Sequence, residues 1–68
     1  MREVIVLIVG DYKSQYINVE FDTVEMLNQQ IDNIIDELDI GCVSVIIEDD
    51  DIFSQKEILF LNENDIEI

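Results

Sequence analysis

The sequence predicts a single small α+β domain over residues 1–68, in the order ββαββ, which a fifth strand at the C-terminus would extend. Three observations lead to this fold class. Hydrophobic residues make up 49% of the chain, far above the content of disordered acidic tails. Short apolar runs alternate with turn signals, and one longer segment has helical periodicity. A chain of 68 residues has room for one core, so we expect one helix to pack on one face of an antiparallel or mixed sheet.

The first two strands are predicted to form a hairpin. Residues 4–9 are an uninterrupted apolar run, a pattern typical of a strand covered on both faces and therefore central. Residues 16–21 alternate between polar and apolar side chains, as a strand with one buried face does. The turn-forming residues of segment 10–15 predict the hairpin connection between them.

Residues 22–39 are predicted to form the helix. Asp22 stands at the N-cap position with Glu25 three residues later, which is the spacing of a capping box. Phe21 and Met26 have the spacing of a hydrophobic staple around that cap. Several independent signals therefore agree on where this helix begins.

An apolar stripe runs along the predicted helix at spacings of three and four residues. Its members are Val24, Leu27, Ile31, Ile34, Ile35 and Leu38. Gly41 follows at the point where a left-handed residue is expected to end the helix. The stripe predicts that the helix covers one face of the sheet.

The rest of the chain is predicted to contribute strands. Residues 42–47 are rich in β-branched side chains and predict a third strand. Residues 48–51 are an acidic loop, and the apolar run 58–61 is interpreted as a fourth strand. Residues 66–68 alternate and predict a short terminal strand after the turn-like segment 62–65.

A second apolar face of the sheet is expected to stay uncovered. One helix covers one face, yet the runs 4–9 and 58–61 carry apolar side chains on both sides. Monomers seldom expose a patch of that kind. The sequence therefore predicts a homodimer or another protein on the open face.

The chain carries an almost unopposed negative charge. Seventeen acids stand against 3 bases, and the net charge of −14 exceeds the magnitude of about 2 to 8 that serves solubility. Between residues 22 and 68 there are 14 acids and one base, Lys56, which gives −13 for that stretch. Phosphate repels such a surface, so we expect no direct nucleic-acid binding and a basic protein surface as the partner.

Two groups of carboxylates are the candidate partner-binding residues. At about 100° per residue, four acids of the predicted helix fall within about 60° of one another, in a row about 20 Å long. They are Glu25, Asp32, Asp36 and Asp39. The second group is the loop of Glu48, Asp49, Asp50 and Asp51. Further acids of the C-terminal segment are expected to join the loop, namely Glu57, Glu63, Asp65 and Glu67.

The residue types offer little for catalysis or cofactor binding. The chain has no histidine and one cysteine, Cys42, which is expected to be a small core residue without an internal disulfide. Its two glycines are assigned to a turn and a helix end, so no glycine-rich phosphate loop is left. We therefore expect no enzyme activity, no catalytic residue and no cofactor. The loop 48–51 lacks the spacing of a calcium site, so no metal site is assigned, although divalent-cation binding there stays open.

The expected location is the cytoplasm, without a membrane partner. No apolar segment approaches the length of about 20 residues that a membrane helix needs. The start of the chain has neither a basic region nor a small-residue cleavage site. A single cysteine also suits a reducing compartment.

The sequence leads to the hypothesis of a small acidic inhibitor. Carboxylates a helical turn apart, about 6 Å, resemble the phosphates of a nucleic acid and could occupy the basic site of a host or defence protein. Small size and extreme acidity are shared with many phage-encoded inhibitors, so a phage or mobile element is the expected source. The alternative is a non-catalytic structural or adaptor module that homo-oligomerises through an apolar sheet face.

Overall fold

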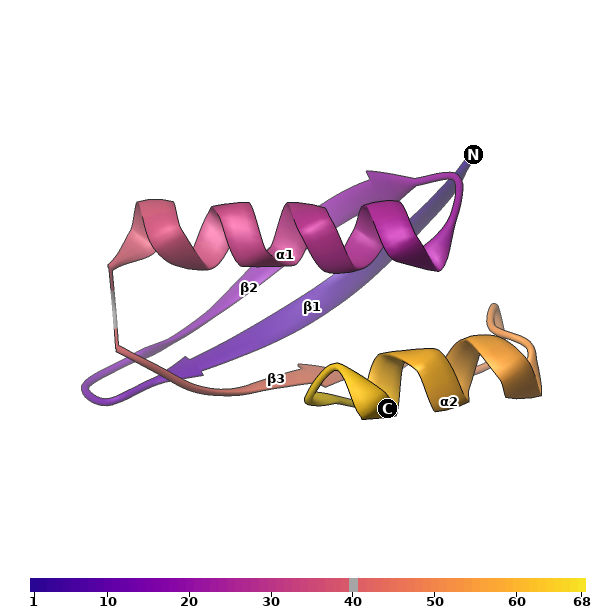
Figure 1. Cartoon of the computed structure of the whole chain (residues 1–68). Helices are drawn as coiled ribbons and strands as arrows, with labels where there is room; N and C mark the ends of the chain where they lie inside the picture. Colours follow the sequence, from indigo (N-terminus) through magenta and orange to yellow (C-terminus); the bar gives the residue numbers. More distant parts are fainter. Residues whose placement is uncertain (40) are drawn as a thin grey trace.

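A computed structural model describes residues 1–39 and 41–68, without the side chains at positions 42 and 43. The chain forms a mixed four-stranded sheet and two helices (Figure 1). In chain order the elements are β1 (Arg2–Gly10), β2 (Ser14–Phe21), α1 (Val24–Leu38), β3 (Cys42–Ile47), α2 (Gln55–Glu63) and β4 (Ile66–Glu67). The prediction that Cys42 is a core residue concerns a side chain outside the described residues.

The sheet has the strand order β2-β1-β3-β4. β1 lies between β2 and β3 and pairs antiparallel with both, so that Leu7 stands opposite Tyr16 on one side and Ile46 on the other. β4 pairs parallel with β3, and α2 makes the crossover between these two strands. The predicted α+β class, the hairpin and the central position of the first strand are confirmed.

One face of the sheet is buried and the other is open. The core contains strand residues Val4, Val6, Ile8, Val19, Phe21, Val45, Ile47 and Ile66, together with Leu27 and Ile31 of α1 and Leu61 of α2. Because side chains alternate along a strand, these strand residues share one face, which both helices cover. On the other face Ile5 and Tyr16 keep 57% and 62% of their surface exposed. The predicted open face is therefore present.

The apolar run 58–61 lies in α2 and not in a strand, which corrects the prediction for that segment. Ser54 caps the helix: its Oγ accepts from the Glu57 backbone N at 3.3 Å, and the Glu57 carboxylate accepts from the Ser54 N at 2.9 Å. Ile58 and Leu61 are one turn apart, and Leu61 is fully buried. Periodicity does not separate strand from helix in so short an apolar run, and the capping box decides it.

The start of α1 also differs from the prediction. Thr23 is the N-cap residue, and its Oγ1 accepts from the Met26 backbone N at 3.2 Å. The predicted N-cap is therefore wrong by one position, and the predicted capping box of Asp22 with Glu25 does not form because the N3 residue is Met26. The predicted staple is wrong for the same reason, since with Thr23 at the N-cap Phe21 and Met26 no longer stand at N′ and N4, and Met26 is 44% exposed.

A residue with left-handed backbone conformation ends α1, as the sequence predicts, but the first such residue is Asp39 and not Gly41. Asp39 has a φ of 51° and its backbone N–H donates to the Ile35 carbonyl at 3.2 Å. Gly41 has a φ of 65°, and a Cβ at that position would lie 2.6 Å from Asp11 Oδ2. The positive φ favours glycine there, and any larger residue would also require the exposed Asp11 side chain to move. Within the described residues, neither helix is long and apolar enough to cross a membrane.

Candidate functional site

The carboxylate row of α1 is exposed along its whole length. Glu25, Asp32, Asp36 and Asp39 are all classed as exposed. Asn28 of α1 donates to Asn64 just beyond α2, whereas Gln30 donates to the Glu20 carbonyl of β2. On a helix with about 100° per residue the row lies on the same side as Asn28. The row therefore follows the flank of α1 that is turned toward α2.

The C-terminal part of this row opposes helix formation. Asp36 and Glu37 lie in the last turn of α1, where the described residues include no basic side chain. The helix dipole is negative at this end, and each exposed acid there costs about 0.3 to 1 kcal/mol. Asp32 and Asp36 add a like-charge pair four residues apart. Nothing in the local structure of α1 compensates for these charges.

The loop of Glu48 to Asp51 is also exposed but lies at a different end of the molecule from most of the row. Arg2 donates to the carbonyls of Ile52 and Asp22, each at 3.1 Å, so this loop lies at the end where α1 begins. In Figure 1 the amino terminus and the starts of both helices lie toward that end, and the hairpin lies toward the other.

Asp39 lies at the hairpin end of the molecule, whose longest dimension is 32 Å. It borders a hollow of about 340 Å³ that also includes hairpin residues, among them Asp11 and Lys13. The eight predicted carboxylates consequently do not converge on one site. Four run along a flank of α1, from Glu25 in its first turn to Asp39 at the hairpin end, and four follow β3 at the end where α1 begins.

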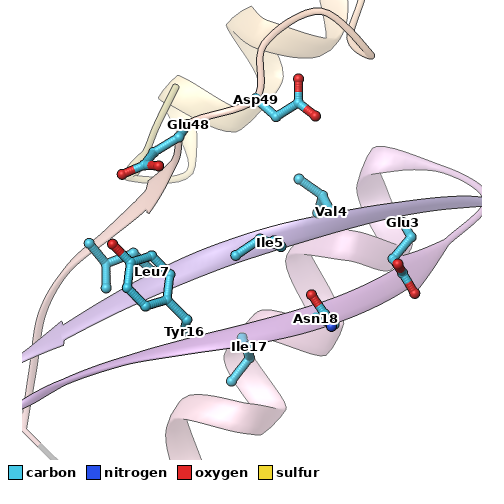
Figure 2. A pocket seen from close by; sticks show the side chains of 9 residues that line it. All are labelled: Glu3, Val4, Ile5, Leu7, Tyr16, Ile17, Asn18, Glu48 and Asp49. Atoms are coloured by element: carbon cyan, nitrogen blue, oxygen red, sulfur yellow. The ribbon is translucent and has the colours of Figure 1, made fainter.

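An open hollow of about 750 Å³ lies on the uncovered face of the sheet. It is lined by Glu3, Val4, Ile5, Leu7, Tyr16, Ile17, Asn18, Glu48 and Asp49, and is called the open-face hollow below. In Figure 2 Glu48 and Asp49 come from the acidic loop, and the other lining residues come from β1 and β2. The hollow thus combines two predicted site residues with Glu3, which the sequence did not single out.

The pairing of the strands explains why the hollow exists. β3 pairs with β1 only from Val6 to Gly10, so residues 2–5 have a partner strand on the β2 side alone. Beyond Ile47 the chain leaves the sheet as the acidic loop. Glu3 stands directly opposite Glu20 across the β1–β2 pair, an arrangement of like charges that destabilises a sheet. The open face is therefore acidic at this end.

Arg2 makes the best-defined polar cluster of the protein, which sequence reasoning missed. Its guanidinium forms a bidentate ion pair with Glu57, with nitrogen–oxygen distances of 3.0 and 2.8 Å. The same group donates to the Ile52 and Asp22 carbonyls. The start of β1, the start of α1 and the start of α2 are joined through one side chain.

Two aromatic rings complete this cluster. The rings of Phe21 and Phe53 stack with centroids 5.7 Å apart and an interplanar angle of 10°. The Arg2 guanidinium carbon lies 4.9 Å from the Phe21 centroid and 5.9 Å from that of Phe53. Cation–π attraction and the packing of the arginine stem add to the ion pair. The cluster is structural, since its polar groups are directed at one another.

Glu57 does not belong to the acidic surface, which corrects its assignment to the second carboxylate group. The hydrogen bond from Arg2, followed by the one from the Ser54 backbone, lowers the pKa of Glu57 from its ordinary 4.5 to about 2. Ion pairs within 4.0 Å in the described part of the chain involve Arg2 and the amino terminus. Lys13 and Lys56 thus neutralise none of the other 16 carboxylates.

Among the described residues, no three side chains of the metal-binding types are grouped so as to hold an ion. The acidic loop is among these residues, and it ends in a turn in which the Phe53 backbone N donates to the Asp50 carbonyl at 3.3 Å. No family model, curated protein or solved structure matches this chain. The chemistry of the surface must therefore carry the functional argument.

Proposed function

We propose that this protein is a non-enzymatic acidic module that binds the basic nucleic-acid site of another protein and competes there with DNA or RNA. The observation that carries the proposal is the exposure of all eight predicted carboxylates, none of which has a lysine or arginine within 4.0 Å in the described part of the chain. A basic partner would supply the missing cations.

Energetics support a role for these charges beyond solubility. The protein retains acids at the end of α1 where they oppose the helix dipole, and it places Glu3 opposite Glu20. Charges that cost stability in the free protein become favourable once a basic surface covers them. We assign the complex to the cytoplasm, which suits a chain with one cysteine. We assign the gene for this protein to a phage or mobile element.

The test begins with capture of partners by immobilised protein, followed by competition with duplex DNA and with RNA. We expect the retained partner to bind nucleic acid, and we expect nucleic acid to displace the acidic protein from it. Affinity should fall steeply between about 50 and about 300 mM salt, because charged contacts dominate. A retained partner without nucleic-acid affinity, or a binding constant that does not change with salt, would contradict the proposal.

A second candidate function, an adaptor that forms homodimers, is favoured by the free edge of β2. This outermost strand has eight residues and a single charge, Glu20, and contains none of the proline or lysine residues that usually protect an edge. Edge-to-edge pairing also avoids the face-to-face contact that would oppose Glu3 and Glu48 with their own copies. Stacking through the sheet face is electrostatically the poorer arrangement.

Sedimentation at increasing salt separates the two candidates. Screening weakens binding to a basic partner but strengthens association between two copies of charge −14. An adaptor should therefore shift from monomer to dimer as salt rises, and an Asn18→Pro variant should stay monomeric because proline removes a backbone donor from the edge. A monomer at every salt concentration would leave the inhibitor as the sole candidate.

A further inference from the structure

The open-face hollow has an apolar floor that the fold does not use. Ile5 is 57% exposed and Tyr16 is 62% exposed. Leu7, which stands opposite Tyr16 in the β1–β2 pair, is half-buried. Both helices lie on the other face, so no described element covers these side chains. The side chains of this floor are accessible to another molecule from the solvent side.

The rim of the hollow restricts what that molecule can be. Carboxylates stand around the floor on Glu3, Glu48 and Asp49, and the nine described residues that line the hollow include neither lysine nor arginine. Phosphate groups would be repelled there, and a second copy placed face to face would bring like charges together. An apolar floor within an anionic rim is complementary to groups that are apolar along their length and positive at their end.

Arginine and lysine side chains are apolar along their length and positively charged at their end. Their aliphatic stems bury well on apolar surfaces while the charged group stays at the edge. Stems lying on Ile5 and Leu7 would bring the cation to the rim carboxylates, where charge-assisted hydrogen bonds form. The exposed ring of Tyr16 offers a further cation–π contact. Neither the carboxylates nor the floor provides this fit alone.

The main chain beside the hollow favours an extended ligand. Val4 lines the hollow although its side chain is only 3% exposed, so its backbone forms part of the wall. Residues 2–5 of β1 lack a partner strand on that side. Extended peptides commonly bind by lying along such a strand and placing alternate side chains into a surface.

We infer that the open-face hollow is the docking site for an extended cationic segment of the partner, with arginine or lysine stems on Ile5 and Leu7 and their charges at Glu3, Glu48 and Asp49. This inference rests on the proposed function, because it identifies where a basic partner binds. It assigns the specific contact to the sheet face and a general electrostatic attraction to the α1 row.

The test uses two labelled synthetic peptides of equal charge, one alternating arginine with valine and one alternating arginine with glycine. Their affinities are measured by fluorescence anisotropy for the wild type and two charge-matched double variants. The hollow variant is Glu48→Gln with Asp49→Asn, and the row variant is Asp32→Asn with Asp36→Asn. Thermal melting of each variant checks folding, which these exposed positions should not impair.

We expect the hollow variant to bind the arginine–valine peptide about tenfold more weakly, since two charge-assisted contacts are lost. The affinity of the row variant for the same peptide should fall only about twofold, as expected if these charges attract the peptide without contacting it. A third variant, Ile5→Ser, should remove the preference for the valine peptide over the glycine peptide without changing the salt dependence. This last result would separate the apolar floor from the charge.

The outcomes that would overturn the inference are distinguishable from one another. If the row variant loses as much affinity as the hollow variant, or if both peptides bind equally to the wild type, the hollow is not the docking site and the proposed function stands. If the wild type binds neither peptide, both the inference and an acidic binding function are wrong. A dimer in sedimentation that Ile5→Ser dissociates would instead make this face a contact between two copies.

Discussion

Glu57 and Asp36 are the same kind of group in opposite surroundings. Glu57 is in the first turn of α2, where the helix dipole is favourable, and it accepts from the Ser54 backbone and from Arg2. Asp36 is in the last turn of α1, where the dipole is unfavourable and the described residues provide no cation. One carboxylate stabilises the fold, and the other opposes it. Most of the other carboxylates resemble Asp36 in having no cation within 4.0 Å in the described part of the chain.

The fold accommodates a well-formed ion pair between Arg2 and Glu57, although the chain has few basic residues. The protein joins three elements with a single arginine, two aromatic rings and one glutamate. The two lysines are placed where they pair with no carboxylate of the described chain. The side-chain ion pair of the described residues therefore lies at one end of the molecule, while most of the other carboxylates are exposed to solvent.

Removing Arg2 should have the largest effect. Arg2→Ala removes the cation from Glu57, leaves two carbonyl groups without the Arg2 donor and uncovers Phe21, so we expect the free energy of unfolding to fall by about 2 to 3 kcal/mol. Urea denaturation followed by circular dichroism measures it. Lys13→Ala removes an equal charge from the exposed hairpin and should change stability by no more than about 0.5 kcal/mol. Equal losses in both variants would mean that only net charge matters.

Replacing Glu57 should have a smaller and pH-dependent effect. Because its folded pKa of about 2 lies below the ordinary 4.5, the folded protein binds fewer protons, and the stabilisation is complete above pH 4.5 and is lost as pH falls to about 2. Glu57→Gln should therefore be less stable by about 1 to 2 kcal/mol at pH 7, after allowance for partial exposure. The difference from the wild type should vanish near pH 2. A difference independent of pH would show that the charge of Glu57 contributes nothing.

Neutralising an acid at either end of the carboxylate row should change the free energy of unfolding in opposite directions. Asp36→Asn removes an unfavourable dipole contact and a like-charge neighbour, so we expect a gain of about 0.5 to 1 kcal/mol. Glu25→Gln removes an acid from the first turn of the same helix and should cost about 0.3 kcal/mol. Chemical denaturation of the two variants measures both. A loss on Asp36→Asn would mean that this aspartate has a stabilising contact after all.

Salt should have an effect on stability of about the same small size as the two row variants. Screening of repulsion between unpaired carboxylates should raise the melting temperature by about 2 to 4 °C on addition of about 0.3 M NaCl. The Arg2–Glu57 pair is screened less, since it is partly buried. Arg2→Ala should therefore keep the same salt increment. A fall in melting temperature for the wild type would show that exposed ion pairs outweigh the repulsion.

Local signals in the sequence were sufficient for most of the fold. The alternation of residues 16–21 predicted which side of β2 is buried, and the apolar stripe of α1 was read from spacing alone. The one misassigned element, α2, carries its own signal in Ser54 and Glu57, which have the spacing of a capping box. That signal marks a helix start just before the apolar run, whose own periodicity is too short to distinguish a helix from a strand.

The exposure of each predicted carboxylate was determined by the sequence, since a charge with no cation near it in the chain is kept in water. The grouping of these carboxylates was not. Glu3 and Asp49 are 46 residues apart in the chain and meet at one hollow because β3 stops pairing with β1 at Val6. Arg2 and Glu57 pair across 55 residues because both helices begin at the end where β1 starts. Only strand order and register bring such distant groups together, and neither is encoded in any short segment.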